Sequence, residues 1–182
     1  MASALVGVKQ GDGPESLSIR RLILLYGIIH ALDGWPLIYM GDEIGLGDNT
    51  AYARDPLQAL DGRWLHRPAM DWTAAERRKI KGTAEAALFD AMTHLAKTAR
   101  ALDARGVAGK ARPISLNQPR ILAFVRDEGP KPFLCLANLS DQPVKAVLPQ
   151  PWSDGANELL TDTRLVDQAV TLQPYAIMWL SA

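Results

Sequence analysis

The chain has 182 residues, of which 48% are hydrophobic and 22% charged, and its 20 basic side chains balance its 20 acidic ones. This composition is typical of a globular protein, and zero net charge argues against nucleic acid or an anionic membrane as a partner. A single cysteine, Cys135, excludes an internal disulfide framework and a CxxC metal site. No export signal opens the chain and no apolar run is long enough for a bilayer, so we expect a cytoplasmic protein. We also expect it to need no cofactor.

The first 110 residues predict helices around one buried strand. From about Ser16 to His30, apolar residues recur at three- and four-residue spacing, which indicates a helix covered on more than one side. The unalternating apolar run Pro36–Met40 predicts a parallel strand that is buried on both faces. Because such a strand needs neighbours and no second one is in view, this region looks like a piece of a larger α/β domain cut upstream of the chain.

A long polar segment follows the predicted strand and extends to about Trp72, and loops of this length are more often functional than idle. Thr73 then predicts the N-cap of a second helix, with Glu76 completing a capping box, and Gly106 ends that helix. Its inward face is expected to carry Ile80, Ala84, Leu88, Met92, Leu95 and Leu102.

Beyond residue 110 the pattern changes to short apolar or alternating runs separated by turn signals. Several short strands with such punctuation indicate an antiparallel β-sandwich of about 70 residues, with a domain boundary near 106–112. The runs are 114–116, 121–125, 133–139, 144–148, 158–160, 169–172 and 175–180.

Two pairs of polar residues are candidates for chemistry. Asp42 and Glu43 directly follow the predicted strand, where α/β barrels place their active sites, although neighbours on an extended segment point to opposite sides. Arg63 and Arg67 offer planar forks to carboxylates, and nearby tryptophans could stack on sugar rings. The alternatives are carboxylates that only hold the turn and a loop that is pinned by surface ion pairs.

The remaining reactive side chains favour structural roles. His30, His66 and His94 show no metal-ligand spacing, and Cys135 lies within an apolar strand run with no histidine nearby. Spacing alone therefore predicts an α/β fragment and a β-sandwich, and no reaction.

Three longer motifs resemble a known family. Residues 36–45, Pro-Leu-Ile-Tyr-Met-Gly-Asp-Glu-Ile-Gly, resemble the eighth barrel strand of the α-amylase superfamily, glycoside hydrolase family 13. Residues 61–68, Asp-Gly-Arg-Trp-Leu-His-Arg-Pro, and the closing residues 172–180 resemble its sucrose-acting branch, the amylosucrases and sucrose hydrolases. Residues 2–7 fit the segment that follows barrel strand seven in the same group.

The resemblance implies the last helix–strand–helix part of a (β/α)8 TIM barrel followed by a C-terminal antiparallel β-sandwich, an α/β fold joined to an all-β one. On this basis residues 1–108 hold helix 7, strand 8, loop 8 and helix 8 of the barrel, and residues 109–182 form the sandwich.

The resemblance also implies a retaining reaction, in which one carboxylate forms a covalent glucosyl-enzyme and a carboxylic acid protonates the leaving fructose. In this family the catalytic carboxylates precede the part of the barrel that begins at Met1, so we expect no catalytic residue in this chain. Arg63 matches the arginine that pairs with an upstream aspartate at the floor of the glucosyl pocket, and Arg67 is the second candidate for substrate binding.

The partners implied are sucrose, an α-glucan in the case of glucosyl transfer, and the missing N-terminal barrel portion. Hydrolysis and glucan synthesis both remain open. The alternative is a non-catalytic carbohydrate-binding module or a truncated structural module.

Overall fold

The computed structural model describes all 182 residues, which divide into two compact units. The first unit consists of residues 1–23 and 37–91, and the second of residues 24–36 and 92–182. No helix of the structure combines the length and the apolar character that crossing a bilayer would require.

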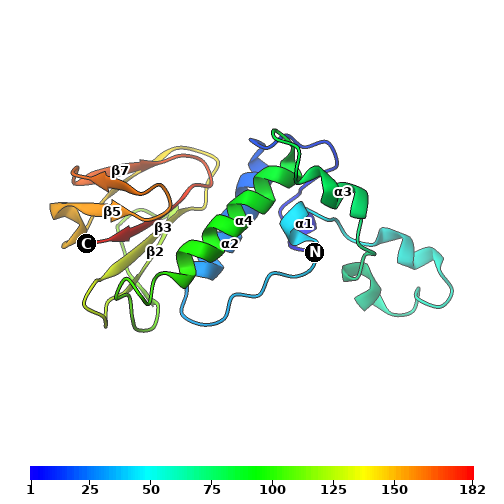
Figure 1. Cartoon of the computed structure of the whole chain (residues 1–182), viewed down its shortest axis with the longest axis horizontal. Coiled ribbons are helices and arrows are strands. Elements are labelled where there is room, and N and C mark those ends of the chain that lie inside the picture. The colour runs from blue at the N-terminus through cyan, green and yellow to red at the C-terminus, as the bar shows by residue number, and fades with distance from the viewer. The chain divides into compact units, whose positions relative to one another are not determined.

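The first unit is helical and holds only short elements besides parts of the two long helices α2 and α4 (Figure 1). A small core of Ile44, Ala74 and Ala75, with Leu46 and Met70 against it, packs the turn after residue 41 onto α3. The elements that begin in this unit are α1 (Ala2–Leu5), α2 (Leu17–Ala31), η1 (Asp42–Ile44), η2 (Thr50–Arg54), η3 (Gly62–His66), α3 (Trp72–Arg77) and α4 (Ala84–Arg100).

The strand predicted at Pro36–Met40 does not form. The segment is extended but unpaired, and the N–H groups of residues 35 and 37–40 donate no hydrogen bond. Its apolar side chains lie in solvent: Trp35 is 100% and Leu37 79% exposed. The strand does not form because a parallel strand needs neighbouring strands for its hydrogen bonds, and none lies beside this segment.

The single helix predicted from Thr73 is in fact two helices. Asp71, not Thr73, caps α3, since its Oδ1 accepts the Ala74 N–H at 2.8 Å. Gly82, with φ +89°, breaks the helical path, and α4 starts after it. As a result the predicted inward residue Ile80 is 55% exposed, whereas Leu88, Met92, Leu95 and Leu102 are buried as predicted.

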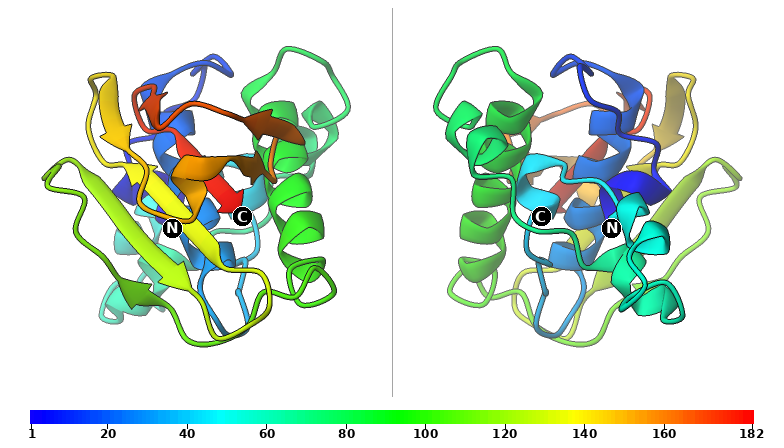
Figure 2. Two further views of the ribbon diagram at one scale, coloured as in Figure 1. Left: turned by 90° about the vertical axis from the view of Figure 1, so that its left-hand side faces the viewer. Right: turned by 90° about the vertical axis from the view of Figure 1, so that its right-hand side faces the viewer.

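The second unit contains an antiparallel β-sandwich. Its six-stranded sheet has the order β1-β2-β3-β8-β5-β6, and a two-stranded sheet pairs β4 with β7. Figures 1 and 2 draw the strands of this sandwich as arrows. The strands are β1 (Arg112–Pro113), β2 (Ile121–Arg126), β3 (Phe133–Asn138), β4 (Val144–Val147), β5 (Ala156–Glu158), β6 (Thr163–Leu165), β7 (Ala169–Leu172) and β8 (Ile177–Ser181). The sequence prediction of this sandwich is confirmed, with three exceptions: it placed the first strand at 114–116, it omitted β6, and its run 158–160 shares only Glu158 with β5.

The central strand β3 is buried along its whole length because both faces of the large sheet are covered. On one face Leu134 and Leu136 pack with residues of β4 and β7 into the sandwich core. On the other face Phe133 and Cys135 lie beside Trp179 of β8, whose ring meets that of Phe133 edge-on at 6.0 Å. All five side chains are fully buried, so this strand is the centre of the core.

Candidate functional site

The two predicted substrate-binding residues, Arg63 and Arg67, line one open concavity of about 590 Å³ in the first unit. Both come from the segment around η3, which brings their side chains to the same hollow. Tyr39 of the unpaired apolar segment and Asp42 of η1 line it too. The remaining lining residues are Met1, Ala2, Leu5 and His66.

Arg63 is held by a carboxylate of its own turn. Asp61 caps η3 by accepting the Arg63 N–H at 3.0 Å. The Arg63 Nε lies 2.9 and 3.0 Å from the two Asp61 carboxylate oxygens, and Nη2 lies 2.8 Å from Oδ2. These hydrogen bonds from the Arg63 side chain and backbone lower the pKa of Asp61 to about 2. The charged guanidinium of Arg63 is therefore held in one orientation by Asp61, although the Arg63 side chain is 76% exposed.

Arg67 makes a different kind of contact. Its guanidinium lies 5.7 Å from the centre of the Trp64 ring, the geometry of a cation–π interaction. The half-buried Trp64 thus contacts an arginine of its own loop. Beside it, the ring nitrogen Nδ1 of the exposed His66 lies 3.3 Å from Asp48 Oδ1. Arg67, Trp64 and His66 therefore contribute to holding this loop together.

Asp42 and Glu43 hold the turn that ends the extended segment. Gly41 and Gly45 bracket η1 with φ of +95° and +71°, a left-handed conformation that glycine adopts without strain. Glu43 Oε2 accepts the Gly41 N–H at 2.7 Å, and the buried Asp42 accepts the Ala2 N–H at 3.2 Å. Both carboxylates thus accept backbone N–H groups, as expected if they only hold the turn.

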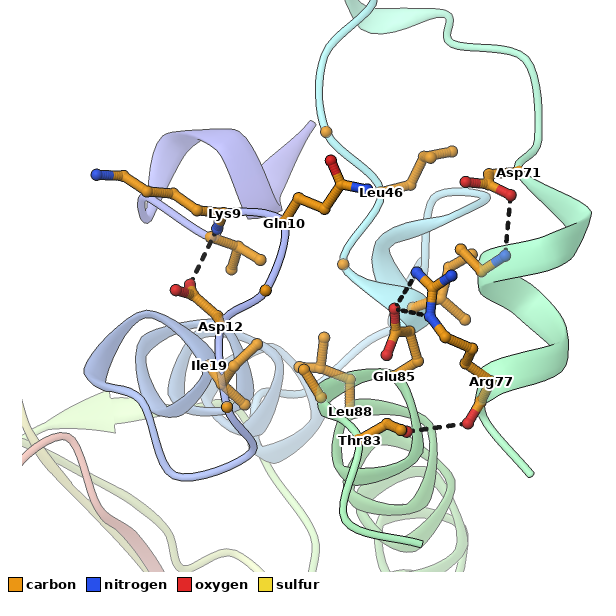
Figure 3. A pocket seen from close by; sticks show the side chains of 18 of the residues that line it. Lys9, Gln10, Asp12, Ile19, Leu46, Asp71, Arg77, Thr83, Glu85 and Leu88 are labelled. Carbon is orange, nitrogen blue, oxygen red and sulfur yellow. Dashed lines mark hydrogen bonds and ion pairs between the residues drawn. The ribbon is translucent and has the colours of Figure 1, made fainter. Parts of the chain in front are cut away.

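A second, larger cavity of about 730 Å³ in the first unit was not expected from the sequence (Figure 3). Apolar residues such as Ile19 and Leu88 form part of its wall, and glycine-rich segments at 11–13 and 45–47 leave it open. The cluster of glycines was the only sequence signal that could have indicated it. No group of three His, Cys, Asp or Glu side chains in the chain is arranged to hold a metal ion.

Two of the charged side chains of this second cavity form an ion pair, and two others accept backbone N–H groups. Arg77 donates from Nε and Nη2 to Glu85 Oε1 at 2.8 and 2.5 Å, and Asp71 caps α3 (Figure 3). Asp12 accepts the Lys9 N–H at 2.9 Å. The cavity therefore offers one ion pair and two carboxylates bonded to backbone N–H groups on an apolar wall, with no reactive pair of groups.

The other candidates have structural contacts in the second unit. His30 Nδ1 lies 2.8 Å from the Tyr26 carbonyl, and His94 Nε2 lies 2.7 Å from the Leu160 carbonyl, so each ring nitrogen donates to a backbone oxygen. Burial raises the pKa of the Cys135 thiol, which keeps it protonated. Trp152 is buried in the sandwich core, so it offers no surface for a sugar ring.

Residues 114–179 match the family model of the maltogenic amylase C-terminal domain. Among solved structures, an Anoxybacillus α-amylase is 17% identical over 90% of this chain and 32% of its own, with a TM-score of 0.64. A maltogenic amylase from S. marinus is 21% identical over 89% of this chain and 19% of its own, with a TM-score of 0.57. Trehalose-6-phosphate hydrolase from Bacillus licheniformis is 16% identical over 89% of this chain and 38% of its own, with a TM-score of 0.64.

These likenesses show that the chain shares its fold with a part of each of these hydrolases, and that its β-sandwich is similar to the C-terminal domain of maltogenic amylases. The chain spans less than two fifths of the length of each of these solved proteins.

Proposed function

We propose that the chain is the C-terminal part of a sucrose-acting, retaining α-glucosyl enzyme of the α-amylase superfamily. It supplies part of the glucosyl pocket, and the catalytic carboxylates come from the upstream portion of the barrel. The enzyme transfers glucose from sucrose either to water or to an α-glucan. In this proposal residues 1–108 belong to the barrel and residues 109–182 form the C-terminal sandwich domain.

The observation that carries this proposal is the extended, unpaired segment Trp35–Met40. A run of exposed apolar side chains is costly in water, and the unpaired N–H groups beside them are available to a neighbouring strand. An adjacent strand on each side would pair these groups, and the layers of a larger domain would cover the side chains. The segment ends at the Gly41 turn, next to the concavity that Arg63 lines. A strand whose C-terminal end lies beside a concavity with charged side chains at its wall is the arrangement that β/α barrels use for their active sites.

Arg63 and Arg67 support the choice of a sugar substrate. Guanidinium forks suit the oxygens of a carboxylate or of vicinal hydroxyls, and Arg63 is already charged and oriented by Asp61. We assign Arg63 to the floor of the glucosyl pocket and Arg67, which lies over Trp64, to bracing the loop and to a secondary contact with substrate. The preference for sucrose rests on the resemblance of residues 61–68 and 172–180 to the sucrose-acting branch.

The alternative of a carbohydrate-binding module is less well supported. Such modules present exposed aromatic rings to sugars, but every Phe, Trp and Tyr of residues 109–182 is buried or half-buried. A sandwich without exposed aromatic side chains favours a structural role for this domain within a larger enzyme.

The test is to express the chain together with the coding sequence upstream of Met1 and to assay the product with sucrose. We expect upstream strands, release of fructose, and either free glucose or a growing α-glucan. A matched Arg63→Ala variant should lose most of this activity. An upstream sequence without barrel strands, or a product that acts on other α-glucosides and leaves sucrose intact, would contradict the proposal.

A further inference from the structure

The guanidinium of Arg63 has two edges that can bind an acceptor, and only one of them is occupied. Nε and Nη2 form the side edge, which donates to both oxygens of Asp61. The end edge, formed by one Nη1 hydrogen and the second Nη2 hydrogen, donates to nothing in the structure. An arginine can therefore hold one carboxylate from the side and a second acceptor from the end.

Asp61 is the only residue whose side chain hydrogen-bonds Arg63. Single exposed ion pairs contribute little, but bidentate arginine–carboxylate geometry is the exception. Here the same carboxylate also caps η3 through the Arg63 N–H, so backbone and side chain are fixed by one group two residues away. A flexible side chain that is 76% exposed would otherwise sample many rotamers.

We propose that Asp61 is a positioning residue that holds Arg63 by its side edge and leaves the end edge free for an oxygen of the glucosyl unit or of a pocket carboxylate. This inference rests on the proposed function for the identity of that acceptor. The orientation of Arg63 itself does not depend on it, because both residues belong to one turn of this chain.

The first arm of the test needs only the 182-residue chain. In Asp61→Asn the amide oxygen can still accept the Arg63 N–H, but the charged bidentate contact is lost. We expect the Arg63 Nε–H, followed by NMR, to exchange with water about 10-fold faster, as loss of one charge-assisted hydrogen bond implies. The matched control is Asp71→Asn, which alters a cap of the same kind on α3 and should leave this signal unchanged.

The second arm uses the sucrose-cleaving protein that contains this chain. If Asp61 acts through Arg63, Asp61→Asn should lower kcat/KM about 10-fold in the wild-type background and have no further effect in Arg63→Ala. Asp61→Glu should not restore activity, since its longer side chain cannot form the cap and the fork together.

The outcomes separate the two proposals. An unchanged Arg63 Nε–H signal in Asp61→Asn overturns the positioning role, whatever the substrate is. An equal loss of kcat/KM on adding Asp61→Asn to Arg63→Ala overturns it as well, because Asp61 then acts independently. A perturbed signal in a protein that leaves sucrose intact supports the positioning role and contradicts the proposed function.

Discussion

Gly27 of α2 lies so close to Ile177 of β8 that a Cβ on the glycine would be 2.8 Å from Ile177 Cδ1. The same Cβ would be 3.6 Å from Leu95 Cδ2 of α4, an ordinary contact. Helix α2 thus packs directly on the sheet face that also carries Trp179. The absence of a side chain at Gly27 is what permits this approach.

The new Cβ would also lie 3.1 Å from Ile177 Cγ2, which the stiff β-branch cannot turn away as easily as Cδ1. We therefore expect Gly27→Ala to lower the free energy of unfolding by about 1 kcal/mol, because the overpacking outweighs the better helix propensity of alanine. Urea unfolding followed by circular dichroism measures the change. The control is Gly47→Ala, where no atom lies within 4 Å of the added Cβ. Shortening the neighbour in Ile177→Val should remove most of the penalty, and a Gly27→Ala variant more stable than the wild type would contradict the close approach.

The sandwich could be predicted from the sequence because its signals are local. Runs such as 133–138 are bounded by turn residues and alternate between two covered faces, so strand positions follow from pattern alone. The segment 36–40 carries an equally clear strand signal, yet its outcome depends on neighbouring strands that this chain does not provide. The pairing of Arg63 with Asp61 was also missed, because sequence spacing shows that two charges are near each other but not which atoms meet.

Hydrogen exchange should distinguish the paired strand β3 from the unpaired segment 37–40. We expect the amides of β3, which are paired on both sides, to be among the most protected in the chain. The amides of Leu37–Met40 should exchange at the rate of an unstructured peptide, because they donate no hydrogen bond. Strong protection of Leu37–Met40 in a monomer would mean that the segment is paired within the chain, which would remove the main support for the barrel interpretation.

Asp33 should titrate below its usual range. The Ala111 N–H donates to Asp33 Oδ1 at 2.8 Å, and this bond lowers the pKa of the carboxyl from 3.8. Because the folded pKa is the lower one, the contact stabilises fully above about pH 4 and is lost as the pH falls through the folded value. NMR of the Asp33 carboxyl carbon should give a midpoint below 3.8, with the Ala111 amide shift following the same curve. A midpoint at or above 3.8 would contradict the hydrogen bond.

Arg63 and Arg67 should differ in their effect on activity in a sucrose-cleaving protein that contains this chain. Arg63→Ala removes the fork at the proposed pocket floor, and loss of substrate positioning can lower activity by about 100-fold or more. Arg67→Ala removes the contact with Trp64 and should mainly loosen the loop. Initial rates with sucrose, together with thermal unfolding of each variant, separate the two effects. Near-normal turnover in Arg63→Ala with loss of turnover in Arg67→Ala would reverse the assignment.

The chain alone should not cleave sucrose. Retaining chemistry needs two carboxyl groups about 5–5.5 Å apart across the anomeric carbon. The acids beside the concavity are engaged elsewhere: buried Asp42 accepts the Ala2 N–H, Glu43 accepts the Gly41 N–H, and Asp61 binds Arg63.

To test whether the chain alone cleaves sucrose, the purified chain is incubated with sucrose and the released glucose and fructose are measured. The double variant Asp42→Asn/Glu43→Gln is the matched control. We expect both proteins to give the background rate, since holding two carboxylates to the tolerance of catalysis needs rigid supporting elements, and the segment before Asp42 has no paired neighbour. Turnover that follows the chain through purification and disappears in the double variant would mean that Asp42 and Glu43 form a complete active site.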